Sequence, residues 1–482
     1  MRSMFEASDH DRLKKIRPTP DIEAEDYRSE FRRDSARLVH SPAFRRSQGK
    51  TQLFPGPESD FFRNRLTHQL EVGQIAKSIA IRLNRTESFL AQKHMALDPD
   101  LAEFAGWCHD LGHPPFGHTG EFVLDDLMKD HGGFEGNAQT LRILSKTEKK
   151  EKDNAHLTGI SDLNADCRLG LNLTARSLAS ILKYDRRIPE KNDDRPEPGA
   201  LTKGYYDSES EVVEWIKERV TGCKNYRGDL KTIECRIMDI ADDIAYSTYD
   251  LEDALKGRLL SPSDILAASD ALLERVRERA NKNPQLRLSK ADIYWHLEDT
   301  FFDVVRSTKS EADRGEEAGI YSVRIAHRSG MNLADSGYLR TKFTSDLVGE
   351  AIRAIQFTPN PSIPSLSEVT LEDDALAKVE IRKHLVYESL IESPRLKVSQ
   401  FRGQRIIREV FQAIAGTEDP DRAVKPHPEL LPPDFQELYN RVGESERRRV
   451  VCDFVSGMTD RYAVEFYGRL TSENPQSFFK PF

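Results

Sequence analysis

Apolar residues recur at three- and four-residue spacing along most of the chain, while stretches that alternate apolar and polar residues are scarce. The first pattern is typical of helices that bury one face, and the second of half-buried strands. We therefore predict an all-α fold, with helix ends placed to within about two to four residues. The predicted helices cover residues 66–83, 101–111, 121–129, 137–145, 174–184, 209–220, 230–255, 263–280, 290–307, 334–355, 371–392, 400–415 and 444–470.

Three stretches interrupt this pattern. Residues 146–166 are rich in Lys, Glu and Asn, and residues 186–208 mix prolines with charges, so we expect both to be exposed excursions from the helical body. Residues 357–368 carry three prolines and mark a boundary. We predict a main body in residues 1–356 and a C-terminal helical region in 357–482, with one continuous domain as the alternative.

The charge balance gives the whole chain no attraction for polyanions, because 80 acidic residues face 71 basic ones and the net charge is -9. A basic cluster at Arg45, Arg46, Lys50, Arg63 and Arg65 is the local exception. It is interpreted either as an anion site or as scattered solvated charges.

Cysteine usage and hydropathy bound the location of the protein. The five cysteines form no CxxC pair, which argues against a disulfide framework and a thiolate zinc site. No run approaches the roughly 20 apolar residues of a membrane helix. We expect a soluble protein of the reducing cytoplasm.

The densest chemistry lies between Trp107 and Glu121, where five ligand-type or acid–base side chains fall within thirteen residues. His109 and Asp110 stand near the end of an apolar helix, about 100° apart around its axis, so both can reach one interior point. A buried aspartate beside a histidine is costly, and a metal ion relieves that cost. This pair predicts a metal site.

The residues after this pair predict a turn and a second helix. Pro114 and Pro115 cannot continue a helix, and Thr119 is the expected N-cap of the next one. His118 and Glu121 would then stand at a helix N-terminus, which attracts anions, and both can move protons. His113 is interpreted as a supporting or structural histidine, with a direct role as the alternative.

Two further segments carry candidate residues. Arg65 and His68 stand one turn apart at the start of a predicted helix. Asp242, Tyr246 and Asp250 line up at four-residue spacing beside a stripe of isoleucines, so Asp242 is expected to be a half-buried carboxylate in need of a partner.

The order of these residues along the chain resembles the pattern of the HD superfamily of phosphohydrolases: first a histidine, then a His-Asp pair, then a distant aspartate. More narrowly, six blocks look like the deoxyguanosine triphosphate triphosphohydrolases, and the chain is more distantly similar to the eukaryotic dNTP triphosphohydrolase that pairs an HD domain with a SAM domain. The blocks are Lys50 to Pro55, Arg65 to His68, His109 to His118, Gly133 to Gln139, Asp239 to Tyr246 and Gly457 to Ala463.

The resemblance implies a role for each matching residue. His68, His109, Asp110 and Asp242 would hold a metal ion, with Asp242 preferred over Asp243 because the family places a tyrosine four residues after the ligand. His118 and Glu121 match the catalytic pair, with Asp110 beside them. The substrate would be bound by Arg65 and Lys183 at phosphate, Gln52 and Asp250 at the sugar 3'-hydroxyl, and Tyr246 against the deoxyribose. Gln48 is the alternative to Gln52.

The same resemblance implies a cofactor and partners. A site of two histidines and two aspartates suits Mn or Mg, our working choice, and also Fe, Co, Ni or Zn. Residues 1–356 would be an HD-domain catalytic core with an N-terminal substrate-binding segment. We expect hydrolysis of dGTP to deoxyguanosine and triphosphate. We also expect a homo-oligomer, with a hexamer as the form that the family suggests, and an effector that is single-stranded DNA or a nucleotide. The alternatives are an HD phosphohydrolase for a monophosphate, cyclic or alarmone nucleotide, and a nucleotide or nucleic-acid sensor with a vestigial HD site.

Overall fold

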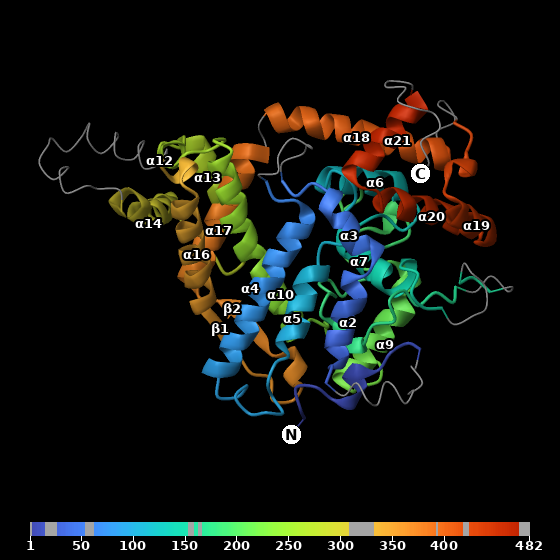
Figure 1. The fold of residues 1–482 in the computed structure, drawn as a ribbon, viewed down its shortest axis with the longest axis horizontal. Coiled ribbons are helices and arrows are strands. Elements are labelled where there is room, and N and C mark those ends of the chain that lie inside the picture. The colour runs from blue at the N-terminus through green and yellow to red at the C-terminus, as the bar shows by residue number, and fades with distance from the viewer. Residues whose placement is uncertain are drawn as a thin grey trace, which may run out of the picture. The chain divides into compact units, whose positions relative to one another are not determined.

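The computed structural model describes residues 2–14, 27–53, 62–152, 159–161, 166–307, 332–391, 394–417 and 424–471. Its regular elements are helices apart from two short strands, β1 (Ile355–Thr358) and β2 (Glu368–Leu371), which pair with each other (Figure 1). The predicted all-α class is therefore confirmed. No helix in these ranges is long and apolar enough to cross a bilayer.

The chain divides into two compact units, each built from separate stretches of sequence. The first comprises residues 1–238, 359–368 and 399–482, and the second comprises 239–358 and 369–398. The division falls within two helices, α10 (Ile233–Ala245) and α18 (Pro394–Ala415). The two units are defined by contacts within the chain and do not test where separate domains begin and end. The predicted domain boundary between residues 356 and 357 therefore stays a prediction.

The first unit holds the helices that carry most of the predicted site. They are α2 (Glu30–Val39), α3 (Pro42–Arg46), α4 (Arg65–Thr86), α5 (Pro99–Cys108), α6 (His118–Met128), α7 (Gly136–Arg142), α8 (Ala175–Ala179), α9 (Ser210–Thr221), α19 (Pro433–Arg441), α20 (Glu444–Ser456) and α21 (Asp460–Thr471). One apolar core joins α2, α5, α8 and α9, and another joins α6 to α18, α20 and α21. Residues from the two ends of the chain thus share one unit.

The second unit packs around α17 (Asp373–Val386), which contacts four other helices of the unit. These helices are α11 (Leu251–Lys256), α13 (Asp270–Ala280), α14 (Lys290–Ser307) and α16 (Gly337–Arg353), while the short α12 (Pro262–Leu266) packs on α14.

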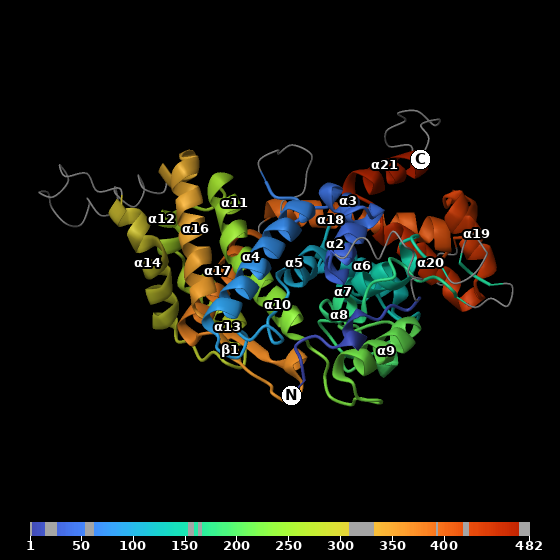
Figure 2. The same cartoon turned by 60° about the horizontal axis from the view of Figure 1, so that its bottom comes forward.

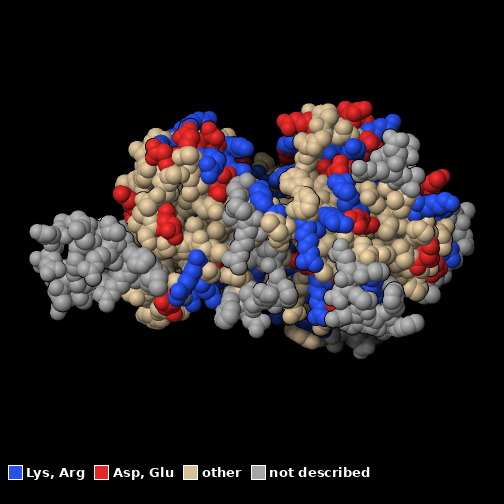
Figure 3. Space-filling model, turned by 90° about the horizontal axis from the view of Figure 1, so that it is seen from above, with Lys and Arg blue, Asp and Glu red and all other residues tan. Residues whose placement is uncertain are grey.

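On the face shown in Figure 3, acidic and basic side chains are interspersed, as the near balance of charges predicts.

Several predicted helices are divided in the structure. The predicted helix 230–255 contains α10, a π-helical segment (Tyr246–Asp250) and α11, and the predicted helix 444–470 contains α20 and α21. A π-turn takes up an extra residue. Asp242, Tyr246 and Asp250 are therefore not aligned on one face of a regular α-helix, as their four-residue spacing predicted.

Residues 186–208 are exposed along most of their length, as predicted, but they also contribute several buried side chains. Arg195 is buried and makes a bidentate ion pair with Asp125 of α6, with both N–O distances 2.8 Å. Ile188, Tyr205 and Tyr206 are buried as well. Charges and prolines suggested exposure, but a fully paired guanidinium can be buried. In the predicted excursion 146–166, residues 153–158 and 162–165 lie outside the described part, and Ile160 is buried.

Candidate metal and catalytic site

Helices α4 and α5 run side by side (Figures 1 and 2) and bring two histidines together. A pair of glycines permits this approach, because a Cβ atom on Gly106 would lie 2.6 Å from the Cα atom of Gly73. Lys77 of α4 is 2.8 Å from both Asp100 and Glu103 of α5. These contacts define an antiparallel pair whose other end brings His68, in the first turn of α4, to His109, the C-cap of α5.

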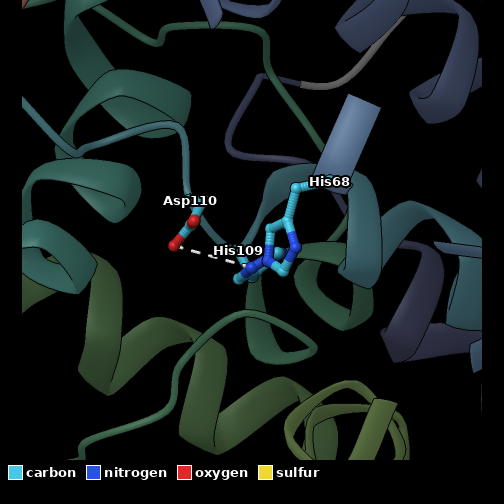
Figure 4. A group of neighbouring side chains, drawn as sticks. All are labelled: His68, His109 and Asp110. Carbon is cyan, nitrogen blue, oxygen red and sulfur yellow. Dashed lines mark ion pairs between the residues drawn. The ribbon is translucent and has the colours of Figure 1, made fainter. Parts of the chain in front are cut away.

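His68, His109 and Asp110 form a buried group that is suited to a metal ion (Figure 4). One ligand atom from each lies within 4.8 Å of the others. The two imidazole centroids are 5.4 Å apart, and Nε2 of His109 is 3.5 Å from Oδ1 of Asp110. Nδ1 of His109 donates to the Gly106 carbonyl at 2.7 Å, which orients the ring and leaves the basic nitrogen at Nε2. Two imidazoles and a carboxylate fit a divalent transition metal.

Asp110 is surrounded by one guanidinium group and two imidazoles. The guanidinium of Arg65, which is itself buried, donates to Oδ2 of Asp110, and Nδ1 of His113 is 3.1 Å from Oδ1. Burial alone would raise the pKa of Asp110, but the combined attraction of His113, Arg65 and His109 lowers it well below its usual value. The carboxylate is therefore ionised, as metal binding requires. This contact favours the supporting role for His113.

A histidine–glutamate pair, His118 and Glu121, lies beside this group. Nδ1 of His118 is 2.8 Å from Oε2 of Glu121, and Oε1 of Glu121 accepts the backbone N–H of Gly136, the first residue of α7, at 2.7 Å. Glu121 is buried, whereas the side chain of His118 is 67% exposed and can reach a ligand. His113, His118 and Glu121 also bring ligand-type atoms within 4.8 Å of one another.

The turn before α6 differs from the sequence prediction. We expected Thr119 as N-cap, but α6 begins at His118 and its N-cap is Gly117. Phe116 and Gly117 have φ angles of 62° and 57°, in the left-handed region that is unfavourable for a residue with a side chain. Two successive left-handed residues turn the chain sharply, so His118 is already helical and stands at the first position of α6.

Glu121 and His118 stabilise each other's charged forms. Burial disfavours the charge on Glu121, but the hydrogen bond with His118 and the nearby His113 outweigh it and lower the pKa to about 2. The surrounding protein disfavours an imidazolium at His118, but the hydrogen bond with Glu121 outweighs this effect and raises the pKa of His118. The carboxylate of Glu121 therefore favours a protonated imidazole at His118.

Glu135 lies behind this pair and was missed at the level of sequence. Its carboxylate accepts the N–H of Ala138 at 2.9 Å as N-cap of α7 and a side-chain N–H of Asn137 at 2.6 Å. Burial, and then repulsion from Glu121, raise the pKa of Glu135 from 4.5 to about 7. Only the block Gly133 to Gln139 pointed to this region.

This shift predicts a pH dependence of stability. Because the folded-state pKa of Glu135 is raised, its contribution to the free energy of unfolding is present below about pH 4.5 and is lost as the pH rises to about 7. In the wild type we expect the free energy of unfolding to fall by about 3 kcal/mol over this window because of Glu135, at about 1.4 kcal/mol per pKa unit, and in Glu135→Gln this decrease should be absent. Urea unfolding of both proteins between pH 4.5 and 8 measures the difference, and parallel curves would contradict the assignment.

The predicted substrate-binding residues of the first unit have distinct surroundings. Both amide atoms of Gln52 are buried and have no hydrogen-bond partner within the described residues. Arg65 donates to the carbonyl oxygen of Thr51 at 3.2 Å, which links Arg65 to the Gln52 segment. Lys183 follows α8, with Nζ 6.0 Å from the ring centroid of Tyr184. Its phosphate contact stays a prediction.

Asp242, Tyr246 and Asp250 belong to the second unit. Asp242 and Asp250 are buried, while Tyr246 is half-buried and opens the π-helical segment. Burial of Asp242 agrees with the carboxylate expected from its isoleucine-rich surroundings. Its role as fourth metal ligand, and the sugar contacts of Tyr246 and Asp250, stay predictions.

Comparison with known proteins shows the family to which the chain belongs. A model of the HD domain matches residues 65–247, and a model of a phosphohydrolase-associated domain matches residues 369–469. A protein of Mesorhizobium japonicum called deoxyguanosinetriphosphate triphosphohydrolase-like protein 2 is 41% identical, with 98% of this chain and 99% of that protein covered. The chain belongs to this family of HD-domain phosphohydrolases.

Other members of the deoxyguanosinetriphosphate triphosphohydrolase-like family are also similar along almost their full length. The protein of Actinobacillus succinogenes is 31% identical, over 92% of this chain and 95% of its own. The protein of Shewanella baltica is 32% identical, over 93% of each chain. The HD match spans His68, His109, Asp110 and the His118–Glu121 pair, so the buried group that could hold a metal ion lies within the HD domain.

Proposed function

We propose that this protein hydrolyses a deoxynucleoside triphosphate, with dGTP as the expected substrate, to the deoxynucleoside and inorganic triphosphate. The observation that supports the proposal is the buried His68, His109 and Asp110 group with a proton-carrying His118–Glu121 pair beside it. In the reaction, water adds to the α-phosphorus and the bond from that phosphorus to the sugar 5'-oxygen breaks. One proton of water ends on the 5'-oxygen.

His68, His109 and Asp110 would hold a divalent cation, with Asp242 as the proposed fourth ligand and Mn or Mg as the expected ion. Such a cation acts as a Lewis acid toward a phosphate oxygen and makes a nearby water more acidic. Arg65 fixes the ionised Asp110 and adds positive charge where phosphoryl charge develops. His118, whose proton Glu121 stabilises, donates that proton to the departing sugar oxygen, and a proton released by the attacking water restores it.

Gln52 is the residue of the first unit best suited to recognise the sugar. Its amide offers a donor and an acceptor, both buried and without a protein partner in the described part of the chain. A sugar hydroxyl could satisfy both, and an analogue without that hydroxyl would leave them unpaired. Tyr246, Asp250 and Lys183 are proposed to complete substrate binding. We also propose a cytoplasmic homo-oligomer, with a hexamer as the form to test by native mass spectrometry.

The deciding experiment incubates metal-replete protein with each of the four dNTPs and with GTP, and resolves the products by ion-exchange chromatography. Deoxynucleoside plus triphosphate supports the proposal, and the order of rates gives the base preference. Monophosphate or pyrophosphate would contradict it and favour another HD phosphohydrolase. If no substrate reacts, even with single-stranded DNA or other nucleotides added, a sensing role replaces it.

We expect Glu121→Gln to reduce kcat by about 100-fold, the lower end of the usual contribution of a positioned proton donor. The neutral amide no longer stabilises the imidazolium, so the pKa of His118 falls and less of the donor is protonated at neutral pH. The pH dependence of kcat measures this change. Glu211→Gln, at an exposed position in the first turn of α9, is the control, and an unchanged profile in Glu121→Gln would refute the role.

A further inference from the structure

The loop between α20 and α21 packs closely on the segment that precedes Gln52. A Cβ atom on Gly49 would lie 2.8 Å from Cγ2 of Thr459, so only glycine fits there without displacement. The buried ammonium group of Lys50 donates to the Ser456 carbonyl at 3.0 Å and also to the His113 carbonyl. Lys50 therefore connects the C-terminal end of α20 to the turn that follows the His-Asp pair.

Asp460, the first residue of α21, makes a second and more extensive connection. Its Oδ2 atom accepts the backbone N–H of Thr51 at 2.9 Å and the Thr51 hydroxyl. Its Oδ1 atom accepts the backbone N–H of Phe116 at 2.9 Å. One carboxylate thus connects the residue before Gln52 to the turn two residues before His118.

The Phe116 contact falls on a backbone that needs support. Phe116 is left-handed without being glycine, and such conformations persist only where the surrounding structure holds them. A charge-assisted hydrogen bond to the N–H of Phe116 supplies such support. The Phe116 ring also packs on α18, where a Cβ atom on Gly403 would lie 2.9 Å from it.

We propose that Asp460 is a positioning residue: its carboxylate fixes the His118 turn and the Gln52 segment relative to each other. The inference rests on the proposed function for its catalytic consequence, and on the contacts alone for its structural one. Shifts of about 1 Å in catalytic groups can reduce rates about 100-fold. Asp460 is thus expected to matter for kcat although it touches no reacting atom.

The test replaces Asp460 with Asn, which has one acceptor oxygen for the two segments. We expect kcat to fall about 10- to 100-fold and hydrogen exchange to accelerate at least about tenfold at the amides of Thr51 and Phe116. Exchange in helices outside the site, such as α9, should stay unchanged. If Asp460→Asn does not fold, Asp460→Glu, which keeps the charge on a longer side chain, is judged by the same criteria.

The matched control is Asp434→Asn, because Asp434 also stands in the first turn of a helix, α19, and interacts with Lys149 instead of the site. Its kcat should stay within about twofold of wild type, which separates a helix-end effect from positioning. Unchanged exchange at Thr51 and Phe116 in Asp460→Asn, or acceleration spread over the whole first unit, would overturn the inference. If wild type hydrolyses no dNTP, the proposed function fails, and exchange alone decides the role of Asp460.

Discussion

His109→Ala is expected to reduce triphosphate release by at least about a thousandfold, the largest effect on activity that we predict. The substitution removes a ligand from the buried His68–His109–Asp110 group, and the charge stabilisation that a bound cation provides is about several kcal/mol. At about 1.4 kcal/mol per tenfold, a loss of about 4 kcal/mol corresponds to that factor.

Two measurements make the expectation for His109→Ala specific. Metal content by inductively coupled plasma mass spectrometry should fall with activity, while the circular dichroism spectrum stays that of wild type. His384→Ala is the control, since His384 pairs with Glu380 in the second unit and is no member of the group. Full activity in His109→Ala, or unchanged metal content, would show that the metal binds elsewhere.

Arg142→Met is expected to reduce the free energy of unfolding by about 3–5 kcal/mol, the typical cost of leaving buried carboxylates without their partner. Arg142 of α7 is 2.8 Å from Asp453 of α20 and 3.0 Å from Glu209, and the side chains of all three are at most 5% exposed. Methionine fills similar space but leaves the buried carboxylate of Asp453 without its ion pair and that of Glu209 with only Lys146, 3.7 Å away.

Urea unfolding followed by tryptophan fluorescence measures this loss. Arg187→Met is the control, because its ion pair with Asp207 is exposed and such pairs contribute about 1 kcal/mol or less. A loss below about 1 kcal/mol in Arg142→Met would mean that Asp453 and Glu209 find other partners or take up protons. Because α7 also supplies the N–H that holds Glu121, a genuine loss should reduce activity before global unfolding.

The parts of the site that could be predicted are those encoded in short stretches of sequence. His109 and Asp110 follow an apolar helix and precede two prolines, and these local signals were sufficient to predict a metal site at the end of α5. The histidine partner at His68 needed the family pattern, because nothing local to α4 indicates that Gly73 and Gly106 bring the two helices together.

The parts that could not be predicted depend on backbone conformation or on distant partners. Gly117 supplies the turn, so the hydroxyl of Thr119 is not needed as a cap. The π-helical segment after α10 leaves no mark in apolar spacing, and neither does the break at residues 457–459, where the apolar pattern continues. The positions of Lys50 and Asp460 in the site depend on partners 406 and 409 residues away along the chain, which no local pattern encodes.

The contacts of residues 456–460 also determine when, during synthesis of the chain, the turn at Phe116 can be held in place. A ribosome adds about 5–20 residues per second, so the turn at Phe116 waits about 20–70 s before Asp460 is made. Until then a nascent chain has the sequence of the HD motif but lacks the carboxylate that holds its catalytic turn. Residues 65–247 should therefore be a poor module for transplantation, and a nonsense mutation shortly before codon 456 should yield a chain with all predicted metal ligands and an unformed catalytic turn.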